Sequence, residues 1–142
     1  MIDAPNGAGI IALNADNHIL MTREYRPHLD QYMWRIPAGK CEAGEDFVQT
    51  AHRELREESG FDAQHMDMFV TYKVDIAFLD RQLAIFVARD LFESPLDTGD
   101  EMIQPDVHFM SPQDVLQLLN DGQIIGDIAA CLYRFLHVYK LV

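Results

Sequence analysis

The stretch GKCEAGEDFVQTAHRELREESGF, Gly39 to Phe61, decides how this chain is interpreted, and its most highly charged part is RELREESG. Within it, residues 45–59 contain no Gly or Pro, which permits an uninterrupted helix. Gly60 follows directly and is a suitable C-terminal cap, because glycine readily adopts a left-handed conformation. We therefore predict a helix over Glu45 to Ser59. Its apolar side comprises Phe47, Val48, Ala51 and Leu55.

Three carboxylates are gathered on this predicted helix. Glu54, Glu57 and Glu58 are spaced i, i+3 and i+4, so their side chains converge on one patch, where like charges repel. Arg53 can pair with Glu57, but Glu54 and Glu58 lie beside the apolar stripe and lean toward the protein body. A hard divalent cation such as Mg²⁺ would neutralise them. An ordinary solvated helix face is the alternative that the local pattern leaves open.

Composition favours one folded domain with a small substrate. The chain has 142 residues, of which 49% are apolar, and we interpret residues 1–142 as a single domain. Its formal net charge of −12 would repel a nucleic acid polymer, which we do not expect as a partner. A small anionic substrate remains compatible, because a bound metal ion can invert the local field.

The remaining composition predicts a protein without disulfides or membrane spans. Cys41 and Cys131 belong to no metal-binding cluster, and two free thiols fit a reducing compartment. The start MIDAPNGAG has no basic region followed by an apolar one, and the apolar tail is interrupted by charged residues. We therefore expect a cytoplasmic location and no membrane partner.

Alternating and β-branched runs predict the strands. GIIAL and HILMT, separated by the turn-forming NADN, suggest a β-hairpin, and MWRIPAG suggests a short strand. MFVTYKVDIAF and QLAIFVARDL read as strands on either side of a turn near Leu79 to Arg81, and VHFM as a final strand. Ser111 is placed to cap a helix that ends near Asn120, and a last helix is expected from about Ile128. This order predicts an α/β fold with a mixed β-sheet between helices.

The spacing around the carboxylates carries a resemblance to a known family. Gly39 is followed after five residues by Glu45, and after seven more by RELREESGF. This pattern matches, at seven fixed identities and two apolar positions, the signature of the Nudix hydrolases, and on these residues the chain is identified as a member of that family. The resemblance implies an α/β/α sandwich and hydrolysis of a nucleoside diphosphate linked to another moiety, with Mg²⁺ or Mn²⁺.

The resemblance also assigns expected roles to individual residues. Glu54, Glu57 and Glu58 would be metal ligands, with the backbone carbonyl of Ala38 as an additional ligand. The motif residues around them would orient these ligands or allow a close backbone approach, namely Arg53, Glu45 and Gly39.

A second similarity narrows the branch of the family. REYRPHLDQYMWRIPAGKCEAGE is similar to the corresponding part of ADP-ribose pyrophosphatases, which would make Arg26 a contact of a substrate phosphate. Glu101, with Asp100, occupies a position where that branch often keeps a catalytic carboxylate in a loop. The chain departs from the branch at Arg35, where Glu is usual, and at Ile76, near which a characteristic proline is missing.

Several functions remain compatible with the sequence. ADP-ribose and nucleotide sugars are the substrates that the branch implies, and dinucleotides and oxidised nucleoside triphosphates are alternatives. A non-catalytic nucleotide-sensing Nudix module and an interaction protein with an acidic surface helix are alternatives of other classes. A homodimer is possible and follows only from the habit of the family.

Overall fold

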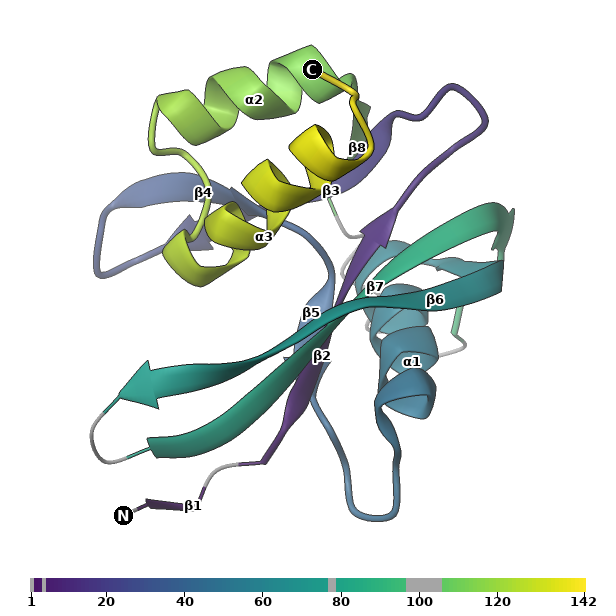
Figure 1. The fold of residues 1–142 in the computed structure, drawn as a ribbon, viewed down its shortest axis with the longest axis vertical. Coiled ribbons are helices and arrows are strands. Elements are labelled where there is room, and N and C mark those ends of the chain that lie inside the picture. The colour runs from purple at the N-terminus through teal and green to yellow at the C-terminus, as the bar shows by residue number, and fades with distance from the viewer. Residues whose placement is uncertain (1, 4, 77–78, 97–105) are drawn as a thin grey trace.

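The computed structural model describes residues 2–3, 5–76, 79–96 and 106–142. Its elements follow one another along the chain as shown in Figure 1. In order they are β1 (Ile2–Asp3), β2 (Gly7–Ala12), β3 (Ile19–Arg26), β4 (Gln31–Arg35), β5 (Ala38–Lys40), α1 (Phe47–Ser59), β6 (Phe61–Ile76), β7 (Leu79–Glu93), β8 (Val107–Met110), α2 (Pro112–Asn120) and α3 (Gly126–Val138).

The strands form two sheets. The larger one has five strands and is mixed: β7 is parallel to β1 and β2, whereas β6 pairs with β7 and β5 pairs with β2 in antiparallel fashion. The smaller sheet is antiparallel, with the order β4-β3-β8. The predicted α/β class with a mixed sheet is confirmed, and the separate smaller sheet was not predicted.

Helices cover both faces of the larger sheet, as the predicted sandwich requires (Figure 1). Alternate residues of a strand point to opposite faces, so Ile10 of β2 packs with Leu55 of α1 in one buried cluster. Ile11, the next residue, belongs to the other cluster, which contains Val115 of α2 and Phe135 of α3. The functional helix α1 and the two late helices therefore lie on opposite sides of β2 and β7.

Local sequence explains where α1 begins and ends. The Asp46 side chain accepts a hydrogen bond from the Gln49 backbone N–H, and the Gln49 side chain accepts one from the Asp46 N–H, which completes a capping box. Gly60 ends the helix with a left-handed φ of 77°. The predicted helix is confirmed, but it starts at Phe47 rather than Glu45, because Asp46 is the cap.

The predicted hairpin between GIIAL and HILMT is wrong. β2 enters the five-stranded sheet and β3 the three-stranded one, and between these two segments the isolated Leu13–Ile19 bridge is the pairing seen in the described residues. Every residue of β2 is buried, which suits a strand held between β5 and β7. Asn14 closes the connecting loop, because its Oδ1 accepts hydrogen bonds from the backbone N–H groups of Asp16 and His18.

The pairing of β6 with β7 is confirmed, but the turn was misplaced. Leu79 to Arg81 belong to β7, and the connection is at residues 77–78, outside the described residues. β6 also begins earlier than predicted, at Phe61 directly after α1, since its antiparallel register with β7 continues as far as Glu93.

The first of the two late helices has the expected cap. Ser111 accepts a hydrogen bond from the Asp114 N–H at the start of α2, and Pro112 occupies the first helical turn. α3 begins at Gly126, two residues before the predicted start. Within the described residues, no helix is long and apolar enough to cross a membrane.

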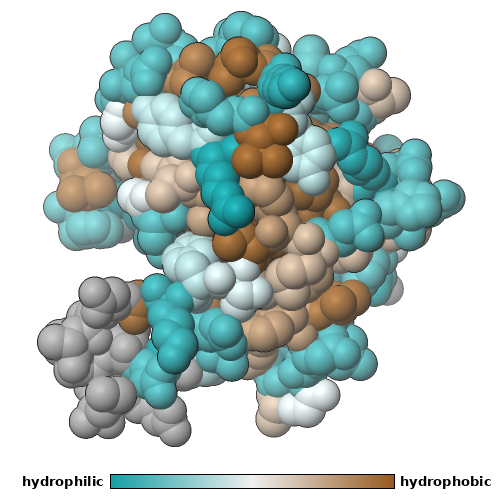
Figure 2. Space-filling model, viewed as in Figure 1, coloured by the Kyte–Doolittle hydropathy of each residue, from teal (hydrophilic) through white to brown (hydrophobic). Residues whose placement is uncertain are grey.

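Figure 2 shows the surface of the molecule from the same side as Figure 1. Hydrophobic residues lie in the middle of this face, bordered by hydrophilic ones.

Candidate active site

The three glutamates of α1 differ in their exposure. Glu54 is 8% exposed and Glu58 is half-buried, whereas the Glu57 side chain is 41% exposed. This gradient follows from the helical wheel, because Glu54 and Glu58 both lie beside the buried Leu55, whereas Glu57 is farther from it. The prediction that these two carboxylates lean toward the protein body is confirmed.

Arg53 is the centre of an ion-pair network on α1. Its Nε and Nη2 donate to the two carboxylate oxygens of Glu45 at 2.8 and 2.9 Å, and Nη2 also donates to the Lys40 carbonyl at 2.8 Å. Its Nη1 donates to Glu54 at 2.8 Å and to Glu57 at 3.1 Å. One guanidinium therefore ties two of the predicted metal ligands to the loop before the helix, which is how Arg53 and Glu45 can orient them.

The charges of this network stabilise one another. The hydrogen bonds from Arg53, followed by one from the Glu42 backbone, lower the pKa of the Glu45 carboxyl to about 2. The pKa of the Arg53 guanidinium is raised, chiefly by its hydrogen bonds to Glu45. Both groups are therefore ionised at neutral pH, and the network keeps its full set of charge-assisted hydrogen bonds.

Gly39 allows the Glu54 carboxylate to lie against the backbone of β5. A Cβ atom at position 39 would collide with the carboxyl carbon and both carboxyl oxygens of Glu54. The close backbone approach predicted for Gly39 is therefore present, and its partner is a carboxylate of the helix. Gly39 fixes where Glu54 sits at the edge of the five-stranded sheet.

Glu58 contacts the neighbouring residue of the same strand. Its Oε2 accepts a hydrogen bond from the Ala38 N–H at 2.9 Å, while the Ala38 carbonyl accepts one from Arg35 Nη2 at 2.9 Å. Burial raises the pKa of the Glu58 carboxyl to about 7, although the positive charge of Arg35 acts in the opposite direction. The Ala38 carbonyl is thus engaged by a guanidinium, and its role as a metal ligand stays a prediction.

The donor types fit a hard divalent cation, but the side chains are not arranged around one. Carboxylate oxygens are the ligands that Mg²⁺ and Mn²⁺ prefer. Among the described residues, no three acidic, histidine or cysteine side chains lie close enough together to hold a metal ion. Arg53 accounts for this, since it holds Glu54 and Glu57 while Glu58 is turned to the Ala38 N–H. A bound ion would compete with Arg53 for these two carboxylates.

A cavity of about 250 Å³ is separated from these carboxylates by β5, and none of the three glutamates lines it; we call it the box cavity. Arg26 lines it, as do Arg35 and Arg81, so positive charge is concentrated there in a chain of net charge −12. Ala38 and Gly39 form the wall next to the glutamates. The other lining residues are Ala8, Gly9, Tyr72, Leu83, Ile85, Ile125, Asp127 and Ile128.

Residues 3–129 match the sequence profile of the NUDIX domain. The chain belongs to this family, and it is a Nudix hydrolase. It is 30% identical over 137 residues to the methanol dehydrogenase activator of Bacillus methanolicus, covering 96% of this chain and 74% of that protein. It is 26% identical over 141 residues to the ADP-ribose pyrophosphatase of Bacillus subtilis (strain 168), covering 97% and 75%.

A solved structure shows the same fold. The crystal structure of an ADP compounds hydrolase superposes with a TM-score of 0.78 at 24% sequence identity, covering 97% of this chain and 77% of that one. The α/β architecture of this Nudix hydrolase is therefore that of a known member of the family, and the likeness to an ADP-ribose pyrophosphatase-like branch is confirmed.

The remaining predicted residues have different outcomes. Arg26 lines the box cavity, and its Nη2 lies 3.1 Å from Glu24. Glu101 and Asp100 lie outside the described residues. Sequence reasoning missed Arg81 and Tyr72, although the alternation of β7 could have found Arg81: it shares a face with Leu83 and Ile85, which are buried.

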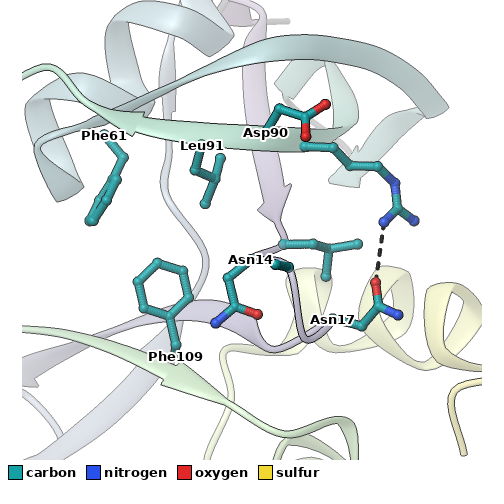
Figure 3. Close-up of a pocket in the computed structure, with 9 residues that line it drawn as sticks. Asn14, Asn17, Phe61, Asp90, Leu91 and Phe109 are labelled. Carbon is teal, nitrogen blue, oxygen red and sulfur yellow. Dashed lines mark hydrogen bonds between the residues drawn. The ribbon is translucent and has the colours of Figure 1, made fainter.

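A second, larger cavity of about 570 Å³ contains none of the predicted residues. Figure 3 shows Phe61, Leu91 and Asp90 above it, with Phe109, Asn14 and Asn17 below. Its polar groups already have partners: Arg89 donates to Asn17, and Asp90 pairs with His65. This cavity is the larger of the two, but no charged residue or glycine of the family motif lines it, whereas Gly39 lines the box cavity.

Proposed function

We propose that this Nudix hydrolase cleaves a nucleoside diphosphate linked to another moiety, in the manner of an ADP-ribose or nucleotide-sugar pyrophosphatase. The observation that carries the proposal is that two residues of β5 join two unlike groups of side chains. Ala38 and Gly39 contact the Glu58 and Glu54 carboxylates of α1, and the same two residues line a cavity together with three arginines. The similarity to an ADP-ribose pyrophosphatase supports the same substrate class.

The arginines of the cavity bind the diphosphate. Arg26 and Arg35 both form ion pairs with the same oxygen of Glu24, at 3.1 and 3.5 Å. One carboxylate therefore balances only part of the charge of two guanidinium groups. Their other N–H groups can donate to phosphate oxygens, and bidentate contacts of this kind position an anion. Arg26 thereby has the role of a substrate-binding residue.

The glutamates of α1 hold the metal ion, Mg²⁺ or Mn²⁺. Glu54, Glu57 and Glu58 supply its side-chain oxygens and Ala38 a backbone oxygen. When bound, such an ion lowers the pKa of a water molecule and neutralises charge on the phosphate oxygens. Arg53 and Glu45 orient the carboxylates, and Gly39 gives Glu54 the space to reach the edge of the sheet.

The reaction is an attack of water on a phosphorus of the diphosphate. The protein contributes by aligning the anhydride with the glutamates and by shielding its charge, which lowers the barrier to displacement. Glu101 completes the set as a further catalytic carboxylate from its loop. The products are two phosphate monoesters, one of them carrying the nucleoside.

A substrate panel tests this proposal. The purified protein is incubated with ADP-ribose, nucleotide sugars, NADH, diadenosine polyphosphates and oxidised dGTP, each with Mg²⁺, with Mn²⁺ or with a chelator. We expect the highest kcat/KM for ADP-ribose or a nucleotide sugar, release of a nucleoside monophosphate, and no turnover with the chelator. A higher kcat/KM for oxidised dGTP or for a dinucleotide would contradict the proposed substrate class.

A further inference from the structure

The box cavity contains buried hydrogen-bond donors that the protein does not satisfy. Among the described residues, the buried side-chain nitrogen and oxygen atoms without a partner are Arg26 Nε, Tyr72 Oη and Arg81 Nε, and all three residues line this cavity. A buried donor without an acceptor costs free energy, and native structures keep few of them. Their convergence on one cavity indicates a ligand that supplies the acceptors.

Tyr72 and Arg81 form a pair on neighbouring strands. Tyr72 of β6 is opposite Leu83 of β7, and Arg81 is opposite Val74, so Tyr72 and Arg81 are diagonal neighbours on one face of the sheet. Such neighbours are about 7–8 Å apart, close enough for both side chains to contact one small group. Burial raises the pKa of the Tyr72 phenol, so its hydroxyl keeps its proton and remains a donor.

Arg81 has room to face the cavity because Gly7 has no side chain. A Cβ atom at Gly7 would lie 2.6 Å from Arg81 Nη2 and 2.8 Å from the Gly39 carbonyl oxygen. Arg81 forms no ion pair with any described residue, unlike Arg26 and Arg35, which share Glu24. Its guanidinium is therefore available to a ligand in the cavity.

Asp127 adds an acceptor to this side of the cavity. It belongs to the first turn of α3, is exposed, and lines the cavity together with Tyr72 and Arg81. One of its oxygens, Oδ1, accepts a hydrogen bond from the Ile128 N–H at 3.2 Å, so the other is free to accept from a ligand. Two donors and one acceptor thus face the same space.

We propose that Tyr72, Arg81 and Asp127 bind the hydroxyl groups of a sugar attached to the diphosphate, and so select a sugar-terminated substrate. A hydroxyl group both donates and accepts, which matches a mixed set of donors and an acceptor. The inference rests on the proposed function, because it needs the diphosphate to bind to Arg26 and Arg35 in the same cavity.

Two other groups fit these residues less well. A terminal phosphate can accept from Tyr72 and Arg81, but a phosphate dianion has no hydrogen to donate to the Asp127 carboxylate. A second nucleobase would be expected to stack on aromatic rings, but Tyr72 is the one aromatic residue among those that line the cavity. The sugar is the class that uses all three polar groups.

The test compares two substrates that differ only beyond the diphosphate. ADP-ribose carries a sugar there, and the P²-methyl ester of ADP carries a methyl group. The variants are Tyr72→Phe, Arg81→Gln and Asp127→Asn, with Arg89→Gln as the matched control, since Arg89 lies on the same strand but lines the second cavity. Values of kcat and KM, together with Tm, are measured for each protein.

We expect each of the three variants to lower kcat/KM for ADP-ribose about tenfold, as the loss of one hydrogen bond to the substrate would do. In the same variants, kcat/KM for the methyl ester should change less than twofold. The Arg89→Gln control should leave kcat/KM for both substrates unchanged. Equal losses for both substrates, or no loss for ADP-ribose, would overturn the sugar subsite. Turnover of the methyl ester but not of ADP-ribose by the wild type would also overturn it while leaving diphosphate hydrolysis intact. Turnover of neither would contradict the proposed function itself.

Discussion

Arg53 and Arg81 are both partly buried arginines, yet their surroundings are opposite. Arg53 donates to Glu45, Glu54, Glu57 and the Lys40 carbonyl, so its guanidinium is fully used by the protein. Arg81 forms no ion pair with the described residues, and its Nε is buried without a partner. The difference separates an arginine that holds the site together from one that is left for a ligand.

The largest loss of activity is expected on replacing Glu58, the α1 carboxylate that binds the Ala38 N–H. Glu58→Gln keeps the size of the side chain but removes its negative charge, so turnover should fall about 10²- to 10⁴-fold. Steady-state kinetics with Mg²⁺ provide the measurement, and circular dichroism checks that the fold is intact. Glu93→Gln at the exposed end of β7 is the control and should keep wild-type activity. Comparable activity in Glu58→Gln would remove the proposed role.

Replacing Arg53 and Arg81 in turn tests whether the two arginines have different roles. Arg53→Gln should lower both activity, by about 10- to 100-fold, and Tm, because it releases three carboxylates at once. Arg81→Gln should raise KM for the substrate and leave Tm within error, because the protein itself satisfies few of its donors. Differential scanning fluorimetry and kinetics measure both quantities.

Arg56→Gln is the control for the helix, since Arg56 donates from Nε to the Ser94 carbonyl and does not contact the glutamates. The contrast between the two regions is wrong if Arg53→Gln and Arg81→Gln lower Tm equally.

A smaller effect is expected at Gly39. Gly39→Ala places a methyl group where the Glu54 carboxyl lies. The new methyl group is fixed to the backbone of β5, so the Glu54 side chain has to move. We expect a loss of about 1–3 kcal/mol in the free energy of unfolding and about tenfold in kcat. Urea denaturation and kinetics measure these values. Gly126→Ala, where an added Cβ meets open space, is the control. Unchanged kcat in Gly39→Ala would show that the position of Glu54 is not critical.

The smallest effect concerns acid stability. The pKa of Glu45 is lowered from 4.5 to about 2, so its pairing with Arg53 contributes stability above pH 4.5 and this contribution is lost as the pH falls toward 2. Glu45→Gln should therefore lower Tm at pH 7 and flatten the dependence of Tm on pH between 4.5 and 2. Glu42→Gln is the control, because Glu42 is 67% exposed and lies 3.7 Å from Arg53. An unchanged pH profile in Glu45→Gln would exclude this carboxylate as the partner that matters.

Sequence reasoning was most successful where the signal was local. The helix at Phe47–Ser59, the caps at Ser111 and Gly60, and the inward lean of Glu54 all depend on spacing along one helix, which a sequence displays directly. It failed at the hairpin of β2 and β3, because NADN predicts a change of direction but not the sheet that each strand enters.

Sequence reasoning also failed to predict most of the polar residues that line the box cavity, and for the same reason. Arg26 was found by resemblance, whereas Tyr72, Arg81 and Asp127 come from β6, β7 and α3, which the fold brings to one space. Tyr72 and Arg81 belong to two strands that the sequence predicts as neighbours, but nothing in their spacing to Asp127 indicates that it joins them. Their shared property, donors and an acceptor facing a ligand, exists only once β6 and β7 are in register.

The sequence by itself determined the reaction class of this protein, because the spacing from Gly39 to Gly60 follows from the pitch of one helix and the loop before it. It also indicated which carboxylates would face inward. Only the tertiary structure decided that Arg53 also binds Glu45 and the Lys40 carbonyl, that Glu58 accepts a hydrogen bond from the Ala38 N–H, and that unsatisfied donors gather around one cavity. These are contacts between distant segments, and they depend on how sheets and helices pack rather than on the order of residues.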